Sequence, residues 1–292
     1  MRILHFSDPH LPLSVSQIPV HKWFSKRGIG ALNLLRGRGK QFQEAKFKLA
    51  ALDDFRHQQE VDLVICTGDY TALGLEQELV TARMAVSPLM QAPSGYITVP
   101  GNHDLYLQDT INHRWFEQNF KTVLQSDLPE YCVDGIWPQV RLIGDNLAVI
   151  GVNSARANPL PWRSNGIIPS IQLNELDKLL DDARITQRFV IVITHYAARM
   201  PDGKPDSKLH GLINADEFLA VCRKIKQGAL LCGHIHHRYE VDIDGLKARF
   251  FCAGSCTMQG RESFWLYQLD DMKLTAYPGH WDGQKYTLGK NP

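Results

Sequence analysis

The chain has 292 residues, of which 44% are hydrophobic and 22% are charged, and its formal net charge is +1. This composition excludes a disordered tail, a collagen-like rod and a small disulfide scaffold, and the balanced charge does not favour a nucleic-acid binder. No apolar run reaches the roughly 18 residues of a membrane-spanning helix, and the first apolar run is too short for a signal peptide. We therefore expect a cytoplasmic protein.

The spacing of apolar residues predicts alternating strands and helices through the first half of the chain, which is typical of an α/β domain. The expected strands lie at 2–7, 61–67, 96–99, 140–143, 147–152, 189–194, 229–232, 237–243, 247–253, 264–270 and 272–277. The expected helices lie at 42–59, 76–90, 170–183, with Ser170 as N-cap, and 214–226. No repeat or linker divides the chain, so a single domain over residues 1–292 is expected.

Five short segments with metal-binding side chains each directly follow a predicted strand. They are Asp8-Pro9-His10, Gly68-Asp69, Gly101-Asn102-His103-Asp104, Thr194-His195-Tyr196 and Gly233-His234-Ile235-His236-His237. In open α/β sheets, ligands bind beyond the carboxyl ends of the strands. The five segments are therefore expected to converge on one crevice.

The residue types in these segments suit two metal ions. Carboxylate and amide oxygens combined with imidazole nitrogens, without thiolates, favour Mn or Fe, with Zn as an alternative. Each segment alone also has a structural explanation: Asp104 could cap a helix, and His195 could be an ordinary surface histidine. The ordered set, with every member at a strand end, favours a metal site.

The ordered segments resemble the calcineurin-like metallophosphoesterase family, whose pattern is D-x-H, G-D, G-N-H-D/E, a later H and G-H-x-H. The resemblance implies a four-layer α/β/β/α sandwich and an enzyme that hydrolyses phosphoric esters or diphosphates. It also implies a first metal held by Asp8, His10, Asp69 and His236, and a second held by Asp69, Asn102, His195 and His234. A hydroxide between the metals would be the nucleophile, and His103, oriented by Asp104, would donate a proton or stabilise charge.

Two positions depart from the pattern of many relatives. Ala72 stands where many have Asp or Asn, three residues after the bridging Asp69, and Tyr196-Ala197 follows His195 where cyclic-nucleotide enzymes often have Pro or His-Pro-Pro. Neither change removes a ligand. Both leave the identity of the substrate open.

A basic amphipathic insertion at about 18–40 contains no acidic residue. Its apolar positions follow helical spacing, and lysines and arginines lie between them, which is typical of an interfacial helix. Membrane or lipid docking through Trp23, Phe24, Lys26 and Arg27 is one interpretation; a surface helix packed on its own domain and a site for a phosphate-rich polymer are the others. The insertion also resembles a segment of bacterial enzymes that cleave UDP-2,3-diacylglucosamine in lipid A synthesis.

The leading hypothesis is a dinuclear phosphohydrolase that acts on a phosphorylated small molecule or a lipid-linked nucleotide, in the cytoplasm or on the inner face of a membrane. A cyclic nucleotide phosphodiesterase is the first alternative. A metal-free scaffold on the same fold is the second, although no ligand position is lost. A nuclease is disfavoured because the net charge is balanced and no DNA-binding motif is present.

Overall fold

Two six-stranded sheets form the centre of the molecule. The computed structural model describes residues 1–289, with the strand orders β12-β11-β10-β1-β2-β3 and β4-β5-β6-β7-β9-β8. The first sheet contains β1 (Arg2–Phe6), β2 (Leu63–Cys66), β3 (Tyr96–Thr98), β10 (Ser263–Asp270), β11 (Lys273–Trp281) and β12 (Tyr286–Leu288). The second contains β4 (Gln139–Ile143), β5 (Leu147–Gly151), β6 (Phe189–Ile193), β7 (Gly228–Cys232), β8 (Arg238–Val241) and β9 (Arg249–Ala253).

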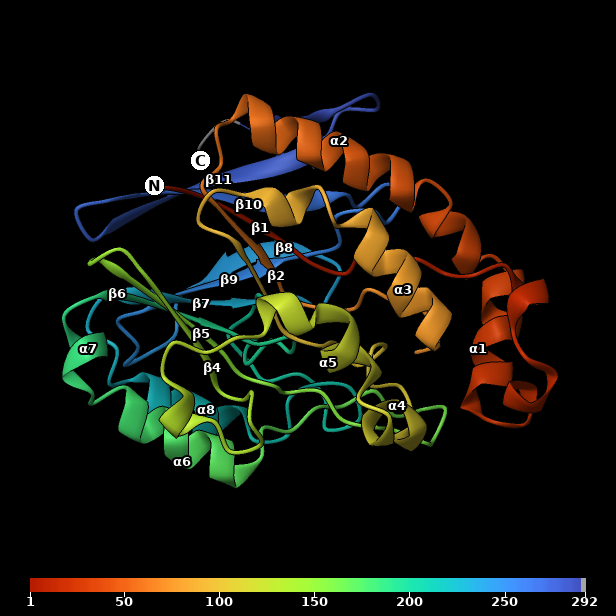
Figure 1. Cartoon of the computed structure of the whole chain (residues 1–292), viewed down its shortest axis with the longest axis horizontal. Helices are drawn as coiled ribbons and strands as arrows, with labels where there is room; N and C mark the ends of the chain where they lie inside the picture. Colours follow the sequence, from red (N-terminus) through yellow and green to blue (C-terminus); the bar gives the residue numbers. More distant parts are fainter. Residues whose placement is uncertain (290–292) are drawn as a thin grey trace.

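Helices cover the outer face of each sheet, which gives the four layers that the family resemblance implies. Figure 1 shows α2 and α3 outside the first sheet and α6 and α8 outside the second. The α-helices are α1 (Lys26–Leu35), α2 (Ala45–Gln58), α3 (Glu76–Ala85), α4 (Gln108–Asn112), α5 (Trp115–Phe120), α6 (Ser170–Leu179), α7 (Ala183–Thr186) and α8 (Ala215–Cys222). Short 3₁₀ helices lie at Val15–Gln17, Val20–Phe24, Arg38–Phe42, Leu89–Gln91, Lys121–Val123 and Pro129–Tyr131.

The inner faces of the two sheets pack against each other. The ring of Phe251 in β9 lies 5.1 Å from the ring of Tyr267 and 5.3 Å from that of Trp265, both in β10. Strands β1, β2 and β3 are parallel, and so are β5, β6, β7 and β9. Parallel strands end at the same edge of a sheet, so the loops that follow them are brought together.

The predicted helices are present but shorter than their apolar patterns. The helix expected at 76–90 ends at Ala85, because Pro88 follows and cannot continue the backbone hydrogen bonding of a helix. The helix expected at 42–59 begins at Ala45, after a 3₁₀ turn. Ser170 is the first residue of α6 rather than its N-cap, a position that Pro169 occupies. Strand β12 was not predicted.

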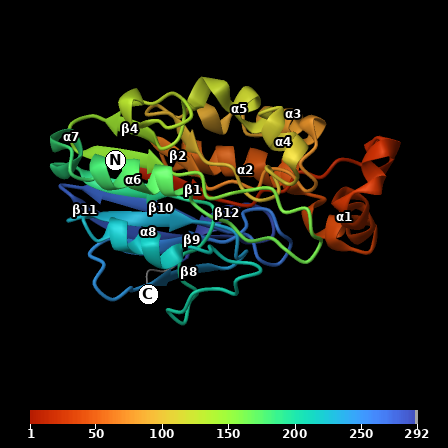
Figure 2. The same ribbon diagram turned by 90° about the horizontal axis from the view of Figure 1, so that it is seen from below.

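The basic insertion folds into a 3₁₀ helix followed by α1, which lies at one end of the molecule, away from α7 (Figures 1 and 2). Ser25 separates the two helices, and its Oγ accepts a hydrogen bond from the backbone N–H of Arg27. A small core joins the insertion to the loop after β2 and contains Ile18, Ala31, Leu34, Ala72, Leu73, Leu75 and Tyr106. Within residues 1–289, no helix is long and apolar enough to cross a membrane.

Candidate metal centre

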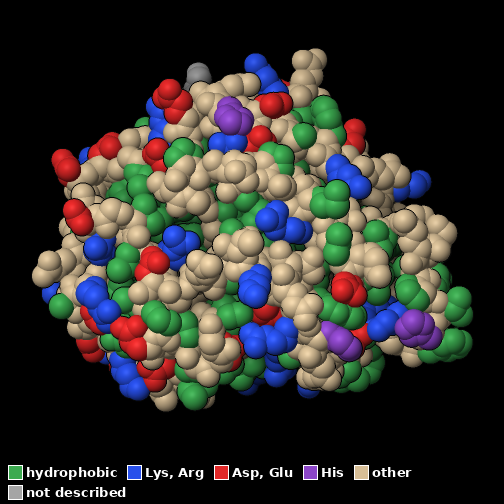
Figure 3. Space-filling view, in the orientation of Figure 1, with side chains coloured by type: hydrophobic (Ala, Val, Ile, Leu, Met, Phe, Trp, Pro, Cys, Tyr) green, Lys and Arg blue, Asp and Glu red, His purple; other side chains and the backbone are tan. Residues whose placement is uncertain are grey.

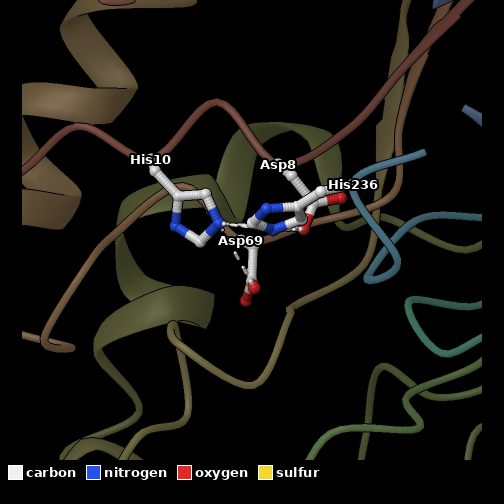
Figure 4. A group of neighbouring side chains, drawn as sticks. All are labelled: Asp8, His10, Asp69 and His236. Atoms are coloured by element: carbon white, nitrogen blue, oxygen red, sulfur yellow. Dashed lines mark hydrogen bonds and ion pairs between the residues drawn. The ribbon is translucent and has the colours of Figure 1, made fainter. Parts of the chain in front are cut away.

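Four side chains from three strand ends form the first group of candidate ligands (Figure 4). The ligand atoms of Asp8, His10, Asp69 and His236 all lie within 4.8 Å of one another. The Nε2 atom of His236 lies 3.0 Å from Asp8 Oδ1 and 3.0 Å from the Nε2 atom of His10. The structure therefore brings together the four residues that the resemblance assigns to the first metal.

A second group shares Asp69 with the first. Asp69, His195 and His234 place one ligand atom each within 4.8 Å of the others. The Oδ2 atom of Asp69 lies 3.4 Å from the Nε2 atom of His195, and Asn102 Oδ1 lies 3.1 Å from that same nitrogen. Asp69 is therefore placed between the two groups, as a bridging ligand must be.

Hydrogen bonds on the outer side of the imidazole rings set which nitrogen faces the centre. The Nδ1 atoms of His10 and His195 donate to the carbonyl oxygens of Thr71 and Thr67, at 2.8 and 2.7 Å. Since a carbonyl only accepts, each Nδ1 carries a proton and each Nε2 faces the centre. Burial alone would lower the pKa of His195, but the adjacent carboxylate of Asp69 raises it to about 9. His234 is reversed, because its Nε2 donates to the carbonyl of His210 at 3.1 Å. Metal-binding histidines are usually oriented in this way.

The charges of these buried groups fit cations at the centre. Asp8 Oδ1 is buried and accepts no hydrogen bond, although Nε2 of His236 lies 3.0 Å from it, and this is costly for a carboxylate oxygen unless a cation neutralises it. Burial lowers the pKa of His10 and of His234, which keeps both imidazoles neutral and able to bind a metal. A buried carboxylate oxygen and three imidazole nitrogens directed inward match the donor set of two divalent ions.

The backbone is strained where the ligands emerge. Asp8, His10, Asp69, His234 and His236 all have a positive φ, between 35° and 72°. For residues other than glycine this conformation costs about 1–2 kcal/mol each, and such strain concentrates at functional sites.

Two glycines in the ligand segments lie where a side chain would clash with the loops that carry the ligands. A Cβ atom on Gly101 would lie 2.1 Å from Asp69 Oδ1, and one on Gly233 would lie 1.9 Å from Ser7 Oγ. Side chains at these positions would displace the bridging carboxylate and the loop of Asp8. The glycines of the G-N-H-D and G-H-x-H segments are thus explained by close backbone approach.

Asp104 does not contact the ring of His103, contrary to the role that the resemblance implies. Its two oxygens accept hydrogen bonds from the backbone N–H groups of Asp69, Tyr70, Thr71 and Gly101, at 2.9–3.1 Å. The side chain therefore fixes the loop that carries Asp69. Burial raises the pKa of Asp104 to about 7, and the N–H groups oppose this rise.

His103 is oriented by other groups. Its Nδ1 donates to the carbonyl of Ala72 at 2.6 Å, and its Nε2 lies 3.1 Å from Nη2 of Arg38. Its ring stacks on Tyr106, with the ring centroids 5.4 Å apart. Burial lowers the pKa of His103 to about 4. The imidazole is thus neutral and presents Nε2 to the space above the ligands.

A cavity of about 520 Å³ opens over these ligands. Asp69, Asn102, His103, His234 and His236 line its floor. Its walls include Lys26 and Arg38 from the insertion, Arg163 and Arg261 from loops, and the ion pair formed by Asp206 and His210. The sequence contained no signal for Tyr106, Arg163, Asp206, His210 and Arg261, which are isolated residues outside any motif.

The four predicted docking residues mostly face the protein, not the solvent. Arg27 is 1% exposed and forms an ion pair with Asp109, at 2.9 Å. Trp23 is half-buried and packs on the small core of the insertion, and Lys26 is half-buried at the cavity wall. Phe24 alone is strongly exposed, at 89%. Arg27 is therefore not available for docking, because the helical spacing did not indicate which face would pack. Docking through Trp23, Phe24 and Lys26 stays a prediction.

A family model described as calcineurin-like phosphoesterase matches residues 1–238. The 3′,5′-cyclic adenosine monophosphate phosphodiesterase CpdA of Escherichia coli strain K12 is 28% identical over 199 residues, which are 67% of this chain and 62% of that protein. The aligned part thus spans about three fifths of the curated relative.

Solved structures share the fold. A dimetal phosphatase from Danio rerio has a TM-score of 0.67 at 12% identity, covering 99% of this chain and 98% of that one. A purple acid phosphatase from yellow lupin (Lupinus luteus) seeds has a TM-score of 0.59 at 12% identity, covering 98% and 52%.

Proposed function

The chain belongs to the calcineurin-like phosphoesterase family, and from this premise we propose that it is a phosphoester hydrolase, which cleaves a phosphodiester or phosphoanhydride bond at the five converging loops. The family uses a dinuclear metal centre. The observation that carries the proposal is the convergence of two ligand groups on the shared carboxylate of Asp69, beside the unpartnered oxygen of Asp8.

Asp8, His10, Asp69 and His236 hold the first metal in this proposal, and Asp69, Asn102, His195 and His234 hold the second. Mn or Fe suits the mixture of oxygen and imidazole donors, and Zn is the alternative. When bound, such a pair supplies a hydroxide at neutral pH and neutralises charge on phosphoryl oxygens.

The residues around the metals divide the remaining tasks. His103 presents Nε2 to the cavity, where it contacts the phosphoryl group or the leaving oxygen. The guanidinium of Arg38 lies beside that nitrogen and adds a permanent positive charge. Asp104 holds the loop of Asp69 and so acts as a positioning residue.

Hydrolysis of bis-(p-nitrophenyl) phosphate, together with elemental analysis of protein purified without chelator, tests the proposal. We expect two metal ions per chain and activity that a chelator abolishes. Activity retained with less than one metal per chain would contradict the dinuclear assignment. A chain with two metals and no activity towards phosphodiesters or phosphoanhydrides would contradict the proposed reaction.

Two substrate classes have separate support. The likeness to CpdA supports a cyclic nucleotide. A lipid-linked nucleotide diphosphate, such as a UDP-diacylglucosamine, is supported by exposed apolar side chains of the insertion, of which Ile29 lines the cavity: Val20, Phe24, Ile29, Leu32 and Leu35. Figure 3 shows hydrophobic side chains on the surface at the end of the molecule where α1 lies. These side chains also support contact with a membrane surface. Comparing the rates of hydrolysis of cyclic AMP and of an acylated sugar nucleotide distinguishes the two substrate classes.

A further inference from the structure

Four cationic side chains line the cavity: Lys26, Arg38, Arg163 and Arg261. We propose that they bind a second phosphate group of the substrate, so that the substrate carries one phosphate beside the one that is attacked. This inference rests on the proposed function and deepens it, because it selects the substrate class. A diphosphate then fits the site better than a cyclic phosphodiester, which carries a single negative charge.

The four cations have no acidic partner. No carboxylate of residues 1–289 lies within ion-pairing distance of any of them, whereas Lys22, Arg27 and Lys48 nearby in the chain are all paired. Two carboxylates line the cavity. Asp69 belongs to the candidate ligands, and Asp206 is paired with His210. The cavity therefore has an excess of positive charge beyond the metals, which an anionic ligand would balance.

Lys26 is held as a fixed cation rather than a mobile surface side chain. Its Nζ donates to the carbonyl oxygens of Asn158 and Arg163, both at 2.9 Å, and lies over the ring of Tyr106, 4.6 Å from the centroid. Burial lowers the pKa of Lys26 to about 8, which reflects the cost of keeping this charge among neutral partners. An anion beside Nζ would offset that cost.

The position of Lys26 relative to His103 suits a second phosphate. His103 stacks on Tyr106 at 5.4 Å, and the ammonium of Lys26 lies over the same ring at 4.6 Å. Nζ is therefore within about 10 Å of the His103 centroid. Arg38 lies beside His103, and the backbone carbonyl of Arg163 accepts a hydrogen bond from Nζ of Lys26. One phosphate above the metals and another near Lys26 would thus both face cations.

Equilibrium binding to the metal-loaded protein tests this without requiring turnover. The probes are inorganic phosphate and methylenediphosphonate, a non-hydrolysable diphosphate analogue, measured by calorimetry. We expect the wild-type protein to bind the diphosphonate at least about tenfold more tightly. Lys26→Gln should reduce this preference about tenfold, the effect of losing one charge-assisted contact. Lys26→Arg keeps the charge and should retain most of the preference.

Two further variants provide a control outside the cavity and a second test inside it. Lys46→Gln, the same change on an exposed lysine of α2 outside the cavity, should leave the preference unaltered. Arg163→Gln should also lower the preference, and it leaves the carbonyl contact of Lys26 in place. Equal binding of both probes by the wild type, no binding of either, or an equal loss for both probes in Lys26→Gln and Arg163→Gln would overturn the inference.

The outcomes also separate this inference from the proposed function. A protein that prefers the diphosphonate in the expected way but hydrolyses no phosphodiester or phosphoanhydride contradicts only the proposed reaction. A protein that hydrolyses bis-(p-nitrophenyl) phosphate but shows no preference contradicts only the second phosphate site.

Discussion

His103 and Asp104 are neighbours in the chain, but their side chains have different partners. His103 presents Nε2 to the cavity, and Asp104 accepts four backbone N–H groups beneath it. A residue that contacts substrate and a residue that holds a ligand loop should respond differently to substitution.

His103→Ala should leave the metal content nearly unchanged and lower the turnover rate by roughly 10²–10⁴, the range for a lost general acid or base. Asp69→Ala should instead lose metal, because it removes the shared carboxylate. Elemental analysis and steady-state kinetics measure both effects, with the exposed His113→Ala as a control expected to retain activity. Loss of metal in His103→Ala but not in Asp69→Ala would reverse the assignment.

Asp104→Asn should lower the free energy of unfolding by about 3 kcal/mol, since an amide nitrogen would face backbone N–H groups that then lack an acceptor. Metal affinity should fall as well, because the loop of Asp69 loosens. Chemical denaturation and metal titration measure these effects. Asp282→Asn is the matched control: Asp282 also accepts two backbone N–H groups, but water can replace it. Unchanged stability in Asp104→Asn would contradict the positioning role.

Much of the site could be predicted at the residue scale because its ligands occur in short segments with a fixed order. The structure brings Asp8, His10, Asp69, His195, His234 and His236 together, and places Asn102 beside them. The partners of His103 could not be predicted, since Arg38, Ala72 and Tyr106 approach it from separate segments. Such contacts depend on the tertiary fold, not on local spacing.

At the scale of elements, α1 is held against the domain by a buried charge. The guanidinium of Arg27 donates to both oxygens of Asp109 at 2.9 Å and to the carbonyls of Leu73 and Gly74. The sequence indicates an amphipathic segment here, and the docking interpretation requires Arg27 to be exposed, whereas it is buried. The sequence pattern does not distinguish a buried arginine from an exposed one, because the acidic partner of Arg27 lies 82 residues away in the chain.

Asp109→Ala should therefore destabilise the insertion, because it leaves the guanidinium of Arg27 buried without a counterion. We expect a loss of about 3 kcal/mol, the lower end for a broken buried pair. Limited trypsin digestion and mass spectrometry should show faster cleavage at residues 22–40. Asp202→Ala, which removes a partner from the exposed Lys204, is the control. Cleavage at an unchanged rate would mean that apolar packing alone holds α1.

The same ion pair predicts a pH dependence. Burial alone would raise the pKa of Asp109, but hydrogen bonds from Arg27 and Lys22 lower it to about 2, below its usual 3.8. Its stabilising contribution is thus present above about pH 4 and is lost as the pH falls towards 2. The difference in stability between the wild type and Asp109→Ala should shrink over this range.

At the scale of the whole molecule, the α/β class could be predicted, but the pairing of strands into two sheets could not. Strands such as β2 and β6 are buried along their whole length, so their sequences have no polar face to indicate which neighbour covers which side. The ligand segments nevertheless indicate which strand ends meet, since side chains that share a metal must lie close together.

The candidate centre joins the two sheets. Asp8, Asp69 and Asn102 follow strands of the first sheet, whereas His195, His234 and His236 follow strands of the second. Metals bound there would bind the native state and not the unfolded chain, and would hold the two sheets together at this edge. Without them, the buried carboxylates of Asp8 and Asp69 lose their counterions.

Metal removal should therefore lower the thermal stability of the whole molecule, not only its activity. A ligand at about a thousand times its Kd stabilises a protein by about 4 kcal/mol, which for a chain of this size is a shift in Tm on the order of 10 °C. Scanning calorimetry of protein stripped with a chelator and then reloaded with Mn²⁺ measures the shift. Asp69→Ala should abolish the metal-dependent part, because it removes the carboxylate that belongs to both ligand groups. His103→Ala should retain that part, since it removes no ligand. A Tm that does not respond to metal in the wild type would mean that the two sheets hold their ligand loops in place without the ions, and that the strain at the five positive-φ ligands is balanced by packing alone.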